Sequence, residues 1–139
     1  MADKKEKNEV KNVIKKLIRE LLKTDVANIH LDGFNITIRT CDARQKIALS
    51  TPVYSGGNYI PKSVRHCVSG RNPFERYAMN THLEIEEDTF SVYLHYLDEI
   101  APINAKHFVD LLEDFSELAE KWRQHLDEHD QNDLVYAHR

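Results

Sequence analysis

Glycine and proline are scarce in this sequence, with four of each in 139 residues, and this excludes a collagen-like chain or one disordered through Pro/Gly-rich repeats. Runs of about 18 apolar residues are also absent, so we expect no membrane-spanning helix. The first residues lack the apolar core of a secretion signal, which favours a soluble, cytoplasmic protein. The length suits one domain over residues 1–139, in which we expect 1–5 and 130–139 to be frayed tails.

Motifs that would indicate an enzyme are missing as well. The two cysteines, Cys41 and Cys67, form no C-x-x-C pair, and we expect two reduced structural thiols. The sequence has no Gly-rich phosphate-binding loop and no G-x-S-x-G nucleophile motif. Neighbouring carboxylates, such as Glu86 and Glu87, fall in predicted turns or on solvated helix faces, which are poor settings for acid–base catalysis. We therefore expect no catalytic residues, no cofactor and no enzymatic activity.

Charge, in contrast, is plentiful and unevenly distributed. Residues 1–24 contain eight Lys or Arg and four Asp or Glu, whereas residues 80–139 contain four basic and fifteen acidic residues. Such an asymmetry is compatible with a nucleic-acid surface on the basic half or a partner surface on the acidic half. The alternative is that the two halves lie side by side and neutralise each other.

Hydrophobic periodicity predicts eight elements. They are a helix over 6–24, strands over 29–31, 34–38 and 46–50, a short helix over 73–79, strands over 82–86 and 90–97, and a helix over 105–128. Asp32–Gly33 favours a type I′ hairpin turn, and Asn72-Pro73 is a helix-start signal, although 61–68 also allows one or two helical turns. The order α-β-β-β-α-β-β-α predicts an α+β domain, with helices packed on an antiparallel sheet of about five strands.

One metal-binding pattern occurs near the end of the chain. His125, Glu128 and His129 match the H-x-x-E-H motif of zinc proteases, in which histidines four residues apart share one helix face. The pattern lies in the last turns of the final predicted helix, so a further ligand would have to come from the short tail or from a distant element. We therefore predict no metal site.

Basic and aromatic residues are interspersed between residues 59 and 77, a composition typical of nucleic-acid grooves. They are Tyr59, Lys62, Arg65, Arg71, Phe74, Arg76 and Tyr77. No RNP motif, KH loop or zinc-finger spacing accompanies them. A nucleic-acid-binding or regulatory module built on segment 59–77 is our alternative function. Otherwise the aromatic residues belong to the core or an interface, and the arginines pair with the acidic half.

The predicted element order resembles that of class I type III secretion chaperones, the Tir-chaperone family, over residues 6–128. The likeness rests on this order, on strand 90–97, and on the closing helix from Phe108 to Leu126 with its aromatic-rich face and Trp122. A YbjN-like family of sensory regulators has a similar layout. The basic first helix and the Gly-interrupted connection 51–72 depart from the chaperone pattern.

The resemblance implies a non-catalytic, cytoplasmic homodimer that binds the N-terminal segment of a secreted effector in extended form. Binding would use apolar patches and strand addition at a sheet edge, without insertion into a membrane. We place the contact with this client protein at Ile36, Ile38, Tyr93 and Leu97. We place the homodimer interface at Val64, Val68, Phe74, Tyr77, Leu83 and Ile85.

Overall fold

The computed structural model describes residues 2–74, 79–99 and 105–137. In chain order these ranges contain α1 (Ala2–Thr24), β1 (Val26–Leu31), β2 (Phe34–Cys41), β3 (Lys46–Ser55), α2 (Lys62–Ser69), β4 (Thr81–Glu86), β5 (Ser91–Glu99) and α3 (Ala105–Ala137). The predicted α+β class and order of elements are confirmed. None of the helices in the described ranges is both long and apolar enough to cross a membrane.

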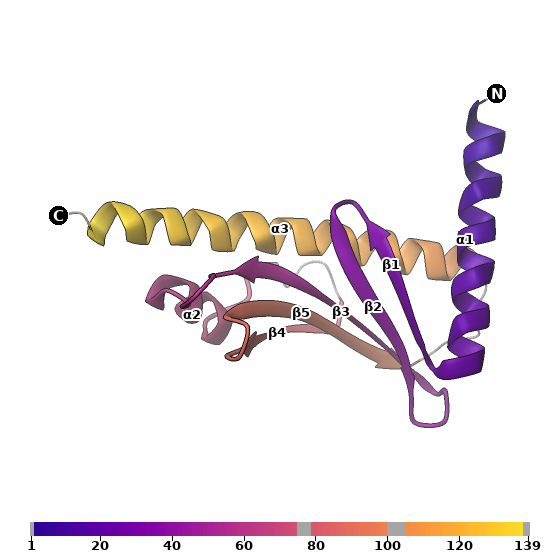
Figure 1. Cartoon of the computed structure of the whole chain (residues 1–139), viewed down its shortest axis with the longest axis horizontal. Helices are drawn as coiled ribbons and strands as arrows, with labels where there is room; N and C mark the ends of the chain where they lie inside the picture. Colours follow the sequence, from indigo (N-terminus) through magenta and orange to yellow (C-terminus); the bar gives the residue numbers. More distant parts are fainter. Residues whose placement is uncertain (1, 75–78, 100–104, 138–139) are drawn as a thin grey trace.

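The five strands form one antiparallel sheet in the order β1-β2-β3-β5-β4 (Figure 1). β1 and β4 are therefore the edge strands, whereas β2, β3 and β5 pair with a strand on both sides. The β1–β2 connection is the predicted tight hairpin, because Leu31 pairs with Phe34 across two residues of positive φ, Asp32 at 52° and Gly33 at 85°.

One face of the sheet, which we call the inner face, forms the core. Alternate side chains of a strand point to the same face, and on this face they are almost fully buried. The strands contribute Ala27, Phe34, Ile36, Ile38, Ile47, Leu49, Val53, Val92 and Leu94. The apolar stripe of α3 packs on the same core and contains Phe108, Leu112, Phe115, Leu118, Trp122 and Leu126.

Both long helices are on the side of the inner face. Figure 1 shows α3 running along the sheet, and α1 standing at one end of the sheet, steeply inclined to α3 and beside the N-terminal end of α3. The buried residues Ile14, Leu17 and Leu21 of α1 belong to the same core cluster. On the opposite face, which we call the outer face, no helix of the described part of the chain is packed.

α3 is also fixed to the β1–β2 hairpin by polar contacts. The Ser116 hydroxyl donates a hydrogen bond to Asp32 Oδ2 at 3.1 Å. The guanidinium of Arg123 lies 4.9 Å from the ring centroid of Phe34, at cation–π distance. The turn that the sequence predicts most sharply is therefore held by the middle of the last helix.

β3 is longer than the predicted strand 46–50, because a bulge lets it continue to Ser55. Pro52 pairs with Tyr93 and Tyr54 pairs with Val92, so the pairing shifts by one residue at Val53. Both Val53 and Tyr54 are buried as a result, although they are consecutive. Proline has no N–H to donate, and it is tolerated in this inner strand because it lies at the bulge.

The short helix lies where the sequence allowed one or two helical turns, over 61–68. α2 spans Lys62–Ser69, whereas we placed the main short helix at 73–79. Oδ1 of Asn72, the predicted cap, accepts a hydrogen bond from the Phe74 N–H at 2.8 Å and so closes a local turn. Residues 75–78 of the predicted helix lie outside the described residues.

The two terminal helices are longer than predicted. α1 begins at Ala2 and α3 continues to Ala137, where we expected frayed tails over 1–5 and 130–139. The added turns of α3 have partners that the sequence does not reveal. Ser63 Oγ donates to the His129 carbonyl oxygen at 3.0 Å, and the Tyr54 side chain hydrogen-bonds to Asp130.

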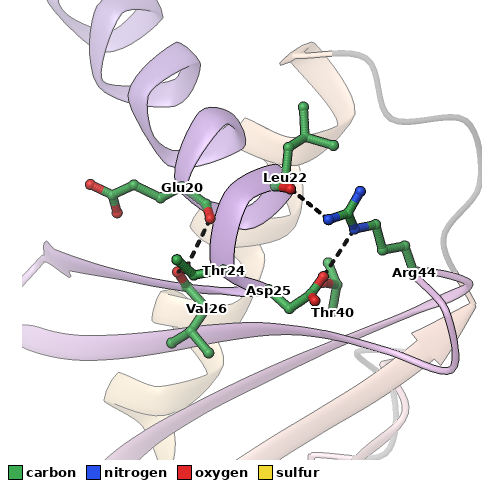
Figure 2. Close-up of polar contacts among 7 residues, drawn as sticks. All are labelled: Glu20, Leu22, Thr24, Asp25, Val26, Thr40 and Arg44. Carbon is green, nitrogen blue, oxygen red and sulfur yellow. Dashed lines mark hydrogen bonds and ion pairs between the residues drawn. The ribbon is translucent and has the colours of Figure 1, made fainter.

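The end of α1 is joined to the sheet by a small polar cluster (Figure 2). Arg44, in the β2–β3 turn, donates from Nη2 to the Leu22 carbonyl oxygen at 2.5 Å and from Nε to Asp25 Oδ1 at 3.0 Å. Thr40 Oγ1 donates to the same carboxylate oxygen at 2.6 Å. Thr24 Oγ1, which donates to the Glu20 carbonyl oxygen at 3.0 Å, completes the last turn of α1. These contacts satisfy acceptors at the helix end, where no intrahelical donor is available.

Candidate partner-binding surface

The outer face of the sheet presents a mixed apolar and polar surface. Paired residues of neighbouring strands share a face, which places the following side chains together there: Arg39 of β2, Ala48, Ser50 and Pro52 of β3, His82 and Glu84 of β4, and Tyr93, His95 and Leu97 of β5. All nine are exposed or partly exposed. A covered sheet would bury such a row of side chains, so this face is available to another molecule.

Tyr93 and Leu97 are the large apolar side chains of this face. Leu97 is 41% exposed and Tyr93 is partly exposed. Tyr93 lies beside Pro52 and Leu97 beside Ala48, and His95 separates the two residues along β5. We call Ala48, Pro52, Tyr93, His95 and Leu97 the outer patch. The structure thus brings together the two β5 residues that we predicted to contact a client.

A group of titratable side chains borders the outer patch. His95 Nε2 lies 3.0 Å from Glu84 Oε2, and the His95 ring stacks on that of His82 with centroids 5.2 Å apart. Partial burial lowers the pKa of His95, whereas the Glu84 carboxylate opposes this shift. A shallow hollow of about 410 Å³ lies beside this group, lined by Arg39, Ser50, Glu84, Ile85, Glu86, Tyr93 and His95.

The other two predicted client residues, Ile36 and Ile38, are inaccessible. Both side chains are 0% exposed, because they point into the core. Their strand, β2, already pairs with β1 and with β3, so it offers no free backbone edge for an added strand. The prediction of a client contact at Ile36 and Ile38 is therefore corrected: alternation identified a shared face, but that face is the covered one.

The predicted dimer residues separate into buried and accessible ones. Val64 is 0% exposed and belongs to the core, which corrects its assignment to an interface. Val68 of α2 and Leu83 and Ile85 of β4 are partly exposed at the edge of the sheet. Phe74 is partly exposed, and its ring contacts Trp122 edge-on at 4.9 Å between centroids. Tyr77 lies outside the described residues.

The basic and aromatic segment 59–77 does not form one continuous groove in its described part. Arg65 forms a two-pronged ion pair with Glu87, at 2.7 and 3.0 Å, in the β4–β5 turn. Phe74 packs against the core, whereas Tyr59 is 56% exposed. The reading in which the arginines pair with the acidic half therefore holds for Arg65. Arg76 and Tyr77 are outside the described residues.

Three potential metal ligands also converge, at the contact between α2 and α3. Ligand atoms of Cys67, His125 and His129 all lie within 4.8 Å of one another. Burial lowers the pKa of His125, and the neighbouring His129 adds to this effect. Burial raises the pKa of the Cys67 thiol. The two histidines were visible as a pattern in the sequence, but no local signal pointed to Cys67, which lies in another helix.

Comparison with known proteins rests on structure, since no protein-family model and no curated protein matches the sequence. A chain in the crystal structure of the ExsC–ExsE complex is 18% identical, with a TM-score of 0.60, over 84% of this chain and 95% of that one. A chain in the HopA1–SchA chaperone–effector complex is 15% identical, with a TM-score of 0.54, over 82% and 92%.

A third solved structure extends the comparison. A chain in the heterodimeric ExoU–SpcU complex from the type III secretion system of Pseudomonas aeruginosa is 10% identical, with a TM-score of 0.52, over 76% of this chain and 82% of that one. At these identities the likeness establishes the fold alone. The chain therefore has the fold of type III secretion chaperones, as the order of its helices and strands predicted.

Proposed function

We propose that the chain is a non-catalytic chaperone that holds the N-terminal segment of a secreted effector in extended form for type III secretion. The observation that carries the proposal is the uncovered outer patch, with Leu97 41% exposed, on a fold shared with a chaperone–effector complex. A buried or helix-covered outer face would leave such a chaperone without this surface.

The shape of the outer patch favours an extended client. The patch is the flat face of a sheet, so a peptide chain can lie along β5 and place alternate side chains on it. Tyr93 and Leu97 are about 13 Å apart along the strand, given a rise of about 3.3 Å per residue. An extended client with apolar residues at i and i+4 matches this spacing. Ser50 and His95, which lie between the apolar positions, provide polar groups for the client backbone.

Strand addition, the second means of binding, requires a free edge. β2 is excluded by its two neighbours, which leaves β1 and β4. We assign β4 to the homodimer, because Leu83 and Ile85 lie on it and Val68 of α2 is close by. The client then uses the outer face, and two copies joined at their β4 edges present two outer patches. A cytoplasmic location follows from this role, since the client is held before export.

The proposal is tested by binding of unfolded N-terminal segments from effectors secreted by the same organism. Labelled segments are titrated with the purified full chain, and binding is followed by fluorescence anisotropy. One segment should bind with a micromolar or tighter Kd, and the double variant Tyr93→Asp/Leu97→Asp should weaken it at least about tenfold, because it places two charges on the apolar patch.

Matched controls make the result specific. His30→Asp adds a charge to the exposed surface of β1, away from the outer patch, and should leave binding unchanged. Circular dichroism of each variant verifies the fold. Unchanged binding in the folded double variant would place the client elsewhere, and the absence of binding to every segment would contradict the chaperone function itself.

A further inference from the structure

Three side chains of metal-ligating type meet where α2 packs on α3. Cys67 comes from α2, and His125 and His129 lie one turn apart on the same side of α3. Their ligand atoms lie within 4.8 Å of one another, and all three residues are partly exposed. Zinc–sulfur and zinc–nitrogen bonds of about 2.3 and 2.1 Å place tetrahedral ligands about 3.4 to 3.7 Å apart, so small side-chain rotations bring the three onto one ion.

We propose that Cys67, His125 and His129 bind one zinc ion, which fastens α2 to the C-terminal part of α3 and reverses our sequence-based expectation of no metal site, because Cys67 supplies the distant ligand. A thiolate with two imidazoles is a donor set that favours zinc over magnesium or calcium, which prefer oxygen ligands. Three protein ligands leave a fourth position, which water occupies in a tetrahedral site. This inference is independent of the proposed chaperone function.

The surroundings hold the ligands in place before an ion arrives. The His125 ring lies 5.8 Å from both Phe74 and Trp122, edge-on to each, so aromatic contacts restrict its orientation. The His129 ring lies 4.7 Å from that of His125. Ser63 Oγ, one turn before Cys67, donates to the His129 carbonyl oxygen at 3.0 Å and fixes α2 against α3 at this level.

An ion can reach the ligands from solvent. A hollow of about 190 Å³ opens between α2 and β4, and both Cys67 and Trp122 line it. The buried Nε1 of Trp122 has no hydrogen-bond partner in the described structure. The Trp122 ring lies beside that of His125, with centroids 5.8 Å apart, and a metal-bound water within reach of the indole N–H would satisfy this otherwise costly buried donor. When zinc binds, the Cys67 thiol releases its proton to solvent and binds as a thiolate.

Cobalt(II), which adopts the same tetrahedral geometry and absorbs visible light, tests the site directly in the wild-type chain. After removal of metal with a chelator, the full-length protein is titrated with Co²⁺ and then with Zn²⁺. We expect thiolate-to-cobalt absorption that saturates at one ion per chain and disappears when zinc displaces the cobalt. Zinc should bind with an apparent Kd below about 1 µM near neutral pH.

Alkylation gives a second readout that needs no variant. A thiol reagent followed by peptide mass spectrometry measures modification of Cys67, and Cys41 on β2 serves as the internal control. Zinc should slow the alkylation of Cys67 at least about tenfold, because the bound thiolate is no longer a free nucleophile, and should leave Cys41 unaffected.

Variants then identify the ligand set. Saturating zinc should raise the Tm of the wild type by about 5 to 10 °C. Cys67→Ser, His125→Ala and His129→Ala should each weaken zinc binding by about 100-fold or more and abolish this rise in Tm. The matched control His66→Ala removes the exposed histidine next to Cys67 and should bind zinc normally. Cobalt binding without thiolate absorption, or equal alkylation of Cys67 with and without zinc, would overturn the proposal.

Discussion

Arg44 and Asp25 form an ion pair of 3.0 Å between the β2–β3 turn and the residue that follows α1 (Figure 2). The same guanidinium reaches the Leu22 carbonyl oxygen, so one side chain holds both a carboxylate and the end of a helix. Positive charge at this end is favourable, because the carbonyl end of a helix carries partial negative charge. Arg44 therefore helps to set the angle at which α1 meets the sheet.

The contribution of Asp25 to stability should disappear in acid. Hydrogen bonds from Thr40 and then Arg44 hold the pKa of the Asp25 carboxyl below its ordinary value. Because the folded pKa is the lower one, the contribution is complete above the unfolded value of about 4 and is lost as pH falls through the folded value. Wild type should therefore exceed Asp25→Asn in urea resistance at pH 6, and the difference should shrink below about pH 4.

Thr40→Val provides the companion measurement for Asp25. It removes the shortest hydrogen bond to the carboxylate, 2.6 Å long, but leaves the Arg44 contact. Between pH 6 and pH 3, the free energy of unfolding of Thr40→Val should lie between those of wild type and Asp25→Asn. A wild-type advantage over Asp25→Asn that stays constant down to pH 3 would show that the ion pair makes no pH-linked contribution.

His95 should make stability depend on pH in a higher range. Burial lowers its pKa, against the opposing charge of Glu84, so the folded state prefers the neutral ring. The favourable contribution is present above the unfolded pKa of about 6.5 and is lost as pH falls through the lower folded value. Urea denaturation of wild type and His95→Gln between pH 5 and 8 should show that the free energy of unfolding falls more steeply with decreasing pH in wild type. If it depends on pH equally in both proteins, the pKa of His95 is not lowered by folding.

Substitutions on the two faces of the sheet should differ sharply in cost. Ile38 is 0% exposed, and Ile38→Ala should lower the free energy of unfolding by about 2 to 5 kcal/mol. Leu97 is 41% exposed, and Leu97→Ala should cost less than about 1 kcal/mol. Urea denaturation of both variants measures the difference. A loss for Leu97→Ala as large as that for Ile38→Ala would mean that the outer face is covered in solution.

The β1–β2 hairpin should depend on Gly33 for its backbone conformation. Gly33 has a φ of 85°, and an added Cβ would lie 3.9 Å from the nearest side-chain atom, Nη1 of Arg123, which is an ordinary packing distance. The cost of Gly33→Ala therefore comes from the backbone and should be about 1 to 2 kcal/mol. Gly33→Asn should cost less, because asparagine adopts positive φ more readily. Equal losses for the two variants would indicate a steric cause instead.

The proposed dimer predicts a molar mass near twice 16.3 kDa by light scattering after size exclusion. Val68→Asp combined with Leu83→Asp should give the monomer, because both partly exposed side chains lie on the proposed α2 and β4 interface. Leu22→Asp is the control: Leu22 is 58% exposed on α1, and its variant should remain dimeric. A wild-type monomer would exclude the β4 interface but leave the outer patch unaffected.

The parts of the fold that could be predicted from sequence are those specified by neighbouring residues. The helical stripe containing Ile14 and Leu17, and the alternation around Asp32–Gly33, each reflect one local period, and the structure confirms them. The bulge at Val53 and the position of α2 depend on contacts between distant segments. The predicted strand ended at residue 50, before Pro52, and only the pairing of Pro52 with Tyr93 shows how β3 continues.

For the candidate surface too, the sequence predicted what depends on neighbouring residues and missed what depends on the packing of distant elements. Alternation along β5 correctly separated Tyr93 and Leu97 from the buried side of the strand. Alternation could not reveal which face of β2 the helices cover. We therefore predicted that Ile36 and Ile38 are accessible to a client, whereas both are buried under the helices. Cys67 was missed because its approach to His125 depends on the packing of one helix on another.

The length of α3 has a mechanical consequence. Its 33 residues form a rod of about 50 Å, which meets the β1–β2 hairpin at Ser116 and Arg123 and meets α2 at His129. A displacement of the end of α3 that contacts α2 would also move the hairpin, because α3 is a continuous helix between these contacts. Any contact that fixes the C-terminal end of α3 therefore also helps to fix the position of β1 and β2.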